Sequence, residues 1–105
     1  MLAGLLAVAI VIPSGAQGLV DSAIADVAKR HQVEATVVEA ERVTWRDGSL
    51  GCPEKGILYT QALVPGWRIV LAAGDLRFEY HAGLKGEPFE CPAWRIRKPL
   101  PGPAK

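Results

Sequence analysis

Alternating apolar and polar residues between positions 67 and 81 form the clearest pattern in this chain. The apolar positions of the alternation are Trp67, Ile69, Leu71, Leu76, Phe78 and Tyr80. Residues 73–75, Ala-Gly-Asp, separate the two runs and favour a tight turn. We therefore expect a two-stranded hairpin with one buried apolar face and a mixed face that carries Arg77, Glu79 and a surface-exposed His81.

A third strand is expected over residues 35–45, where β-branched residues are frequent. The alternation changes phase after Ala40, because Val43 and Trp45 continue it on the opposite side. Such a phase change is typical of a β-bulge, which inserts one extra residue into a strand. We expect the bulge near residues 41–42.

Turn-forming residues then interrupt the chain up to the hairpin. The tripeptide Asp-Gly-Ser at residues 47–49 ends the third strand, and Pro65-Gly66 indicates a further turn. Between these breaks, residues 57–59 are apolar enough for a short strand. The pattern leaves open whether the aromatic residues Trp45 and Tyr59 beside this segment are exposed.

Residues 20–31 have the spacing of one short amphipathic helix. Its apolar face consists of Val20, Ile24, Val27 and Ala28. Asp21 or Ser22 is the expected N-cap, and the basic residues that favour a helix C-terminus are Lys29, Arg30 and His31. The helix would cover the apolar face of the hairpin, which predicts an α+β domain: one N-terminal helix on a small antiparallel sheet, with a long central loop.

The start of the chain has the layout of a secretory signal. Residues 2–12 contain no charge, Pro13 follows, and small residues at Ser14 and Ala16 suit a signal peptidase that cleaves before Gln17. As a helix the apolar run covers about 16 Å, too short for a bilayer core of about 30 Å. No basic residue precedes it, so a retained anchor or buried segment is the alternative. We expect export to the periplasm or medium, and no transmembrane span in the mature chain.

The two cysteines, Cys52 and Cys91, are expected to form one disulfide, since exported proteins with an even number of cysteines usually pair them. The mature chain, residues 17–105, is short for a stable core, and small domains often need such a covalent link. Closing a loop of about 40 residues stabilises a fold by about 4 kcal/mol in the chain-entropy model.

The near-neutral net charge of +1 conceals two parts of opposite sign. All 11 acidic residues precede residue 94, and four of the 12 basic residues follow it. We therefore divide the chain into a signal peptide at 1–16, a small α+β domain at 17–93 and a basic, proline-rich tail at 94–105. The candidate contact residues of the tail are Trp94, Arg95, Arg97 and Lys98. Either the tail is extended and solvated, or it contacts an anionic polymer or lipid of the cell envelope; nucleic acid is not an expected partner.

The central segments resemble a family of small exported bacterial proteins of uncharacterised function. The resemblance covers residues 20–92 and is carried by Val43-Thr44-Trp45, Asp47, Ser49-Leu50-Gly51-Cys52-Pro53, Tyr59-Thr60-Gln61, Pro65-Gly66 and Arg68-Ile69, and by Tyr80-His81 with the segment from Phe89 to Pro92. Arg46 departs from the proline expected there. The resemblance implies a common fold and export, and it implies no activity.

Catalysis and metal binding have little support in the sequence. Asp47, Ser49 and His81 could be combined into a triad, but no Gly-x-Ser-x-Gly pattern surrounds the serine. The histidines and cysteines are isolated, with no Cys-x-x-Cys or His-x-x-x-His spacing. We expect no enzymatic activity, no metal and no cofactor.

The loop of residues 47–61 is the best candidate for function, because long loops in small domains are often functional. Its candidate contact residues are Asp47, Ser49, Leu50, Glu54, Lys55, Tyr59 and Gln61. A disulfide at its base would preorganise the loop for binding. The main hypothesis is an exported binding or inhibitory module for an unknown protein. The alternatives are a loop that only packs over the sheet, and an envelope-associated domain whose tail contacts anionic polymers.

Overall fold

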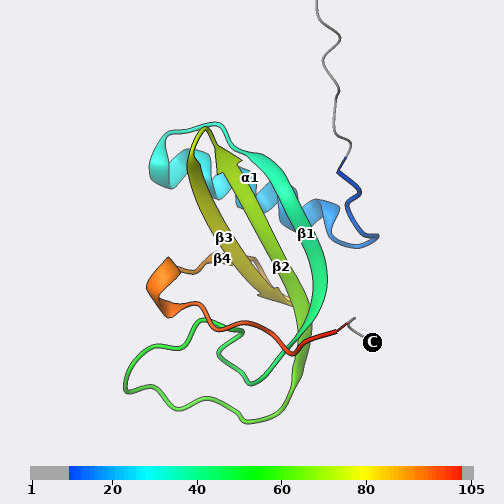
Figure 1. The fold of residues 1–105 in the computed structure, drawn as a ribbon, viewed down its shortest axis with the longest axis vertical. Helices are drawn as coiled ribbons and strands as arrows, with labels where there is room; N and C mark the ends of the chain where they lie inside the picture. Colours follow the sequence, from blue (N-terminus) through cyan, green and yellow to red (C-terminus); the bar gives the residue numbers. More distant parts are fainter. Residues whose placement is uncertain (1–9, 103–105) are drawn as a thin grey trace, which may run out of the picture.

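The computed structural model of the protein describes residues 10–102 and has one helix packed on a four-stranded antiparallel sheet (Figure 1). The strands lie in the order in which they occur in the chain. The elements are α1 (Gln17–His31), β1 (Thr36–Trp45), β2 (Val64–Ala73), β3 (Leu76–Gly83), β4 (Phe89–Glu90) and a short 3₁₀ helix η1 (Ala93–Arg95). The α+β class, the single helix and the antiparallel sheet are confirmed.

The main core lies between α1 and the face of the sheet that the hairpin alternation predicts. Helix residues Val20, Ala23 and Val27 are buried there. They pack on the sheet residues Ile69, Leu71, Phe78 and Tyr80. Two details of the expected apolar set are wrong: Ala28 is exposed on the helix, and Leu76, at the β2–β3 turn, is 54% exposed.

The ends of α1 differ in how well the sequence predicts them. The helix begins at Gln17, three residues earlier than expected, and its N-cap is Ala16, which makes no side-chain hydrogen bond. Asp21 and Ser22 lie within the helix and are not the cap. At the C-terminus the basic last turn is present as expected, and the helix ends where Gln32 takes a left-handed conformation and donates its N–H to Ala28.

The first core continues around Trp67, near the start of the helix. Trp67 and Ala82 are buried against Ala16, and Ile12 packs beside them. The first nine residues of the expected signal lie outside the described residues. Among residues 10–102, no helix is long and apolar enough to cross a membrane.

The sheet register corrects three expectations. The irregularity in β1 lies between Val37 and Glu39, not near residues 41–42. Residues 57–59 form no strand. Pro65 and Gly66 form no turn and are instead paired with Thr44 and Val43 as part of β2. The register shift near Val37 already reverses the side-chain alternation, which leaves Val43 and Trp45 on the face of the sheet away from α1.

Two long segments cover that second face. The loop between β1 and β2, residues 46–63, lies at the end of the sheet opposite the β2–β3 turn, and the C-terminal segment, residues 91–102, runs beside it (Figure 1). The second face is where the polar and chemically distinctive side chains gather.

Candidate functional site

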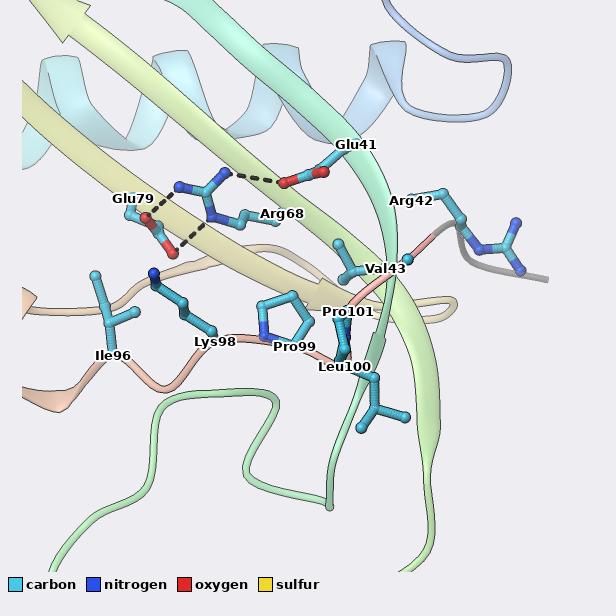
Figure 2. Close-up of a pocket in the computed structure, with 11 residues that line it drawn as sticks. Glu41, Arg42, Val43, Arg68, Glu79, Ile96, Lys98, Pro99, Leu100 and Pro101 are labelled. Carbon is cyan, nitrogen blue, oxygen red and sulfur yellow. Dashed lines mark hydrogen bonds and ion pairs between the residues drawn. The ribbon is translucent and has the colours of Figure 1, made fainter.

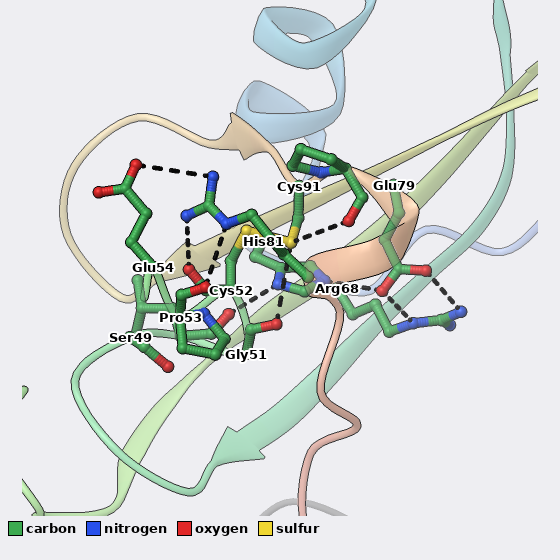
Figure 3. Close-up of a disulfide and its surroundings, with 12 residues drawn as sticks. Ser49, Gly51, Cys52, Pro53, Glu54, Arg68, Glu79, His81 and Cys91 are labelled. Carbon is green, nitrogen blue, oxygen red and sulfur yellow. Dashed lines mark hydrogen bonds and ion pairs between the residues drawn. A yellow bond between two sulfur atoms is a disulfide. The ribbon is translucent and has the colours of Figure 1, made fainter. Parts of the chain in front are cut away.

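The disulfide between Cys52 and Cys91 joins the two segments that cover the second face (Figure 3). Their Cα atoms are 5.8 Å apart, and both residues are buried. This pairing confirms the disulfide that the sequence predicts. It links the β1–β2 loop to the start of the C-terminal segment across 39 residues of chain.

Trp45 is the apolar centre beneath this cover. Its side chain is fully buried, and the indole Nε1 donates a hydrogen bond to the carbonyl of Ala82 at 3.1 Å. The indole crosses β2 at Gly66, where an added Cβ would lie 2.9 Å from Nε1 and 2.1 Å from the Ala82 oxygen. Gly66 therefore serves as the crossing point of the indole, which is why a residue pair typical of turns lies within a strand.

Gly51 covers the other part of the same indole. It has a φ of +73°, and an added Cβ would be 2.4 Å from the ring. A side chain at this position is therefore excluded twice, by backbone conformation and by contact with Trp45. The turn Leu50-Gly51 packs against the tryptophan, so the loop also serves as a lid over the sheet, as the packing alternative expects.

His81 is completely buried beside Trp45, which corrects the expectation of a surface histidine. The two rings are 4.3 Å apart between centroids. The histidine Nδ1 lies 2.6 Å from the carbonyl oxygen of Leu50, and Nε2 lies 2.7 Å from the Glu79 carboxylate. Both ring nitrogens therefore have hydrogen-bond partners within the domain. The alternation pattern places His81 on a polar, exposed face of the sheet, but the loop covers this face and buries the histidine.

Arg68 connects three carboxylates on the same face. Its Nε and Nη2 donate to the two oxygens of Glu79, each at 3.1 Å. Its Nη1 lies 2.9 Å from oxygens of both Glu39 and Glu41. Burial disfavours the charged guanidinium, but the hydrogen bonds to Glu79 and Glu39 outweigh it and raise the pKa of Arg68.

Glu79 is the buried member of this network and links it to His81. Burial tends to raise its pKa, but hydrogen bonds from His81 and Arg68 prevail, so the pKa of Glu79 lies below its ordinary value. The paired charges therefore lock the carboxylate in its ionised form at neutral pH. The sequence pattern gave no indication of this group, since its members come from three strands.

A cavity of about 460 Å³ separates this network from the C-terminal segment (Figure 2). Its lining combines Glu41, Val43, Arg68 and Glu79 from the sheet with Ile96, Lys98 and Pro99 from the C-terminal segment. Figure 2 shows the Lys98 side chain pointing toward the Arg68–Glu79 pair. Arg68 and Glu79 already bond to each other, Arg68 also pairs with Glu39 and Glu41, and Glu79 also bonds His81, so the charged groups of this cavity are engaged within the protein.

Several predicted contact residues of the loop shape the loop itself. The carboxylate of Asp47 accepts hydrogen bonds from the N–H and the hydroxyl of Ser49, at 2.8 and 2.6 Å. These bonds hold the pKa of Asp47 below its ordinary value. The N–H of Gly48 donates to the carbonyl of Thr60 at 2.7 Å, which closes the base of the loop.

The outer part of the loop has a second set of internal bonds. The hydroxyl of Tyr59 accepts the N–H of Glu54 at 3.0 Å, and the Tyr59 carbonyl accepts a hydrogen bond from the Gln61 side chain. Tyr59 is half-buried, whereas Glu54, Lys55 and Gln61 are exposed. Trp45, the other aromatic residue left open by the pattern, is buried.

The described part of the tail is bonded to the domain. The Arg95 guanidinium donates to the carbonyls of Cys52 and Pro53, at 2.8 and 3.1 Å. The Arg97 N–H donates to Gly51. The Lys98 carbonyl accepts from the Arg46 side chain, and the Leu100 N–H donates to Thr44. After η1, residues 96–100 therefore run along the loop and β1, and Arg95 is engaged in holding the segment there.

Large apolar side chains are exposed on the loop and on the turn beside it. Leu58 is 97% exposed, Ile57 50% and Leu63 59%, while Trp94 in η1 is 85% exposed. Ile57 and Trp94 line a common hollow of about 680 Å³. Of these four, only Trp94 was among the predicted contact residues. The sequence signal for the other three was the presence of large aliphatic residues at positions 57, 58 and 63 of the loop.

We use the name tip surface for Lys55, Ile57, Leu58, Trp94 and Arg97. All but Leu58 line that hollow, and Leu58 directly follows Ile57 in the chain. The disulfide and the Arg95 bonds hold the two contributing segments together. In residues 10–102, His, Cys, Asp and Glu side chains form no group of three that could hold a metal ion.

A family model described as "Domain of unknown function (DUF8738)" matches residues 20–91. The chain belongs to this family, which agrees with its resemblance to an uncharacterised group of proteins. No curated protein and no solved structure is significantly similar to the chain. The matched range ends at Cys91, so it includes both cysteines and all four strands.

Proposed function

We propose that this member of the DUF8738 family is an exported, non-enzymatic module that binds a partner protein, and inhibits it where the partner is an enzyme, through the loop of residues 47–61. The observation that carries the proposal is the exposure of Leu58 and Ile57 on a loop with a fixed base. Exposed apolar groups that cluster on one side mark interaction sites. The disulfide and the Gly48–Thr60 hydrogen bond lower the entropy lost on binding.

Export to the periplasm or medium is supported by the disulfide, because such bonds persist in oxidising compartments. The absence of enzymatic activity is supported by the state of the candidate triad. The Ser49 hydroxyl is bonded to Asp47, and both ring nitrogens of His81 are occupied by Leu50 and Glu79. A buried imidazole with both nitrogens engaged is not free to activate a serine.

The second candidate function is an envelope-associated domain that contacts anionic polymers through Arg97 and Lys98. The exposure of these two side chains favours it. Arg95 contributes less than the sequence suggests, since its guanidinium already bonds two loop carbonyls. Two cations are a weak basis for polymer binding, so the loop remains the preferred contact surface.

The test is affinity capture from a detergent-clarified periplasmic extract, which removes membranes. The bait is the full chain, compared with an Ile57→Ser, Leu58→Ser double variant and with Leu76→Ser, which removes an exposed leucine at the other end of the sheet. We expect a partner that the parent and Leu76→Ser recover equally and that the double variant recovers at least about tenfold less, since hot-spot truncation costs over 1.4 kcal/mol. Equal recovery by all three baits would exclude the loop as the contact surface.

A further inference from the structure

The tip surface has the chemistry of a site that attaches to an anionic lipid surface. Leu58 and Trp94 expose 97% and 85% of their surface, on two segments that the disulfide and Arg95 hold together. Tryptophan is enriched where a protein meets the membrane interface, because its ring is apolar and its N–H remains hydrated. Burial of these two side chains in a membrane interface would remove a large apolar surface from water.

The charged groups around these side chains are predominantly basic. Lys55 and Arg97 belong to the tip surface, and Arg97 also lines an adjoining hollow with Arg46 and Lys98. The two hollows contain two acidic residues, Glu54 and Asp47, against five cations, which are Lys55, Arg46, Arg95, Arg97 and Lys98. Glu54 lies 3.8 Å from Arg95, and Asp47 accepts two hydrogen bonds from Ser49. The net field at this end of the molecule therefore complements a negative surface.

We propose that the tip surface binds the headgroup region of a bilayer that contains anionic phospholipid. Leu58, Ile57 and Trp94 enter the interface, and Lys55, Arg97 and Arg46 contact the phosphates. A lipid interface needs only apolar anchors and nearby cations, and the tip surface with its neighbours supplies both. The inference rests on the proposed role of the loop as the contact surface, and it identifies one further ligand for that surface.

The structure offers a direct spectroscopic test, because the three tryptophans differ sharply in exposure. Trp45 and Trp67 are buried at 0% and 6% exposure, so a change in emission on adding vesicles reports Trp94. The full chain is mixed with vesicles of phosphatidylcholine alone, or of equal parts phosphatidylcholine and phosphatidylglycerol. We expect a blue shift, and co-sedimentation that falls with added salt, with the anionic vesicles only.

Variants separate the tip surface from the rest of the chain, whose apolar N-terminal run is common to all of them. Trp94→Ala and Leu58→Ser should each weaken vesicle binding by at least about tenfold, whereas Leu76→Ser should not. Lys55→Gln should weaken it about fivefold, the effect of one cation near an anionic surface. Lys29→Gln, which removes an exposed lysine from the last turn of α1, should leave it unchanged.

Three outcomes would overturn the inference: no binding to anionic vesicles, equal binding to both vesicle types, or equal binding by the parent, Trp94→Ala and Leu58→Ser. The first would assign the tip surface to a protein, and the last would assign binding to the N-terminal run. The vesicles contain no other protein, and the extract for affinity capture contains no membrane. The lipid inference can therefore fail while the protein-binding proposal stands, and the protein-binding proposal can fail while the lipid inference stands.

Discussion

The two faces of the sheet are built by different means. The face under α1 is a continuous apolar core, whose residues lie on one helix and on strands and recur at the regular spacing of those elements. The opposite face carries Trp45, His81 and the charged group around Arg68. It is covered by two segments without long regular structure, which a disulfide joins across 39 residues. Regular elements stabilise the first face, and a covalent link with specific polar contacts stabilises the second.

We call the face under α1 the helix side and the face covered by residues 46–63 and 91–102 the loop side, and the two have separate tasks. The helix side makes the domain fold, and its polar contact between the Tyr80 hydroxyl and Asp26, at 2.6 Å, connects α1 to β3. The loop side connects the exposed apolar loop to the sheet through the disulfide and the hydrogen bonds at the base of the loop. The structure of the loop side depends on a few specific contacts, so we expect single substitutions there to destabilise the protein more than substitutions on the helix side.

The largest expected effect comes from replacing both Cys52 and Cys91 with serine. The loop side should then lose its cover, and the free energy of unfolding should fall by about 4 kcal/mol. Hydrogen exchange should accelerate first at the Arg97 and Leu100 amides, which bond to the loop and to β1. The central amides of the β2–β3 hairpin should stay protected until global unfolding. Equal melting temperatures of the parent and the double variant would contradict this division of the molecule.

The second prediction compares a tryptophan from each face. Trp45→Phe removes indole volume and the hydrogen bond to the Ala82 carbonyl, whereas Trp67→Phe removes indole volume beside Ala16 and Ala82 on the helix side. We expect Trp45→Phe to lower the free energy of unfolding by about 2–3 kcal/mol, and by about 1 kcal/mol more than Trp67→Phe. Urea denaturation of both variants measures the difference.

If Trp67→Phe were the more destabilising of the two, Trp45 would not be the centre of the loop side. Gly66→Ala provides an independent check of the same crossing. Its Cβ would meet the Ala82 oxygen and displace the indole, so it should destabilise the protein, although alanine suits a strand at least as well as glycine.

The same division explains what could be predicted from the sequence. The alternation from Trp67 to Tyr80 and the helical spacing of Val20 and Val27 predict the helix side, because local periodicity determines which residues face a regular core. The disulfide followed from counting cysteines. These features depend on nearby residues or on composition, and they required no knowledge of the tertiary structure.

Prediction of the loop side would have required knowledge of the tertiary structure. His81 occupies a polar position of the alternation, yet segments from elsewhere in the chain bury it. Pro65-Gly66 has the composition of a turn, yet Gly66 lies in a strand because Trp45 crosses it. For the candidate site, the choice of the loop as the contact surface stays a prediction; Asp47 and Ser49 form the internal structure of that loop, and the exposed Leu58 was not among the expected contact residues. Long-range packing decides these roles, and no local pattern encodes it.

The smallest effect, and the most specific to the loop side, concerns Glu79. Its side chain is 14% exposed and bonds both Arg68 and His81. Because its folded-state pKa lies below the ordinary value of 4.5, its ionised form stabilises the fold above that pH, and the contribution is lost as the pH falls through the lowered pKa. Glu79→Gln should cost about 1–2 kcal/mol at pH 7 and flatten the decline of stability below pH 4.5. The exposed Glu87 in the β3–β4 connection supplies the matched control, Glu87→Gln, which should retain the parent profile. Urea denaturation across this pH range measures both, and identical slopes in the two variants would show that the charged network does not stabilise the loop side.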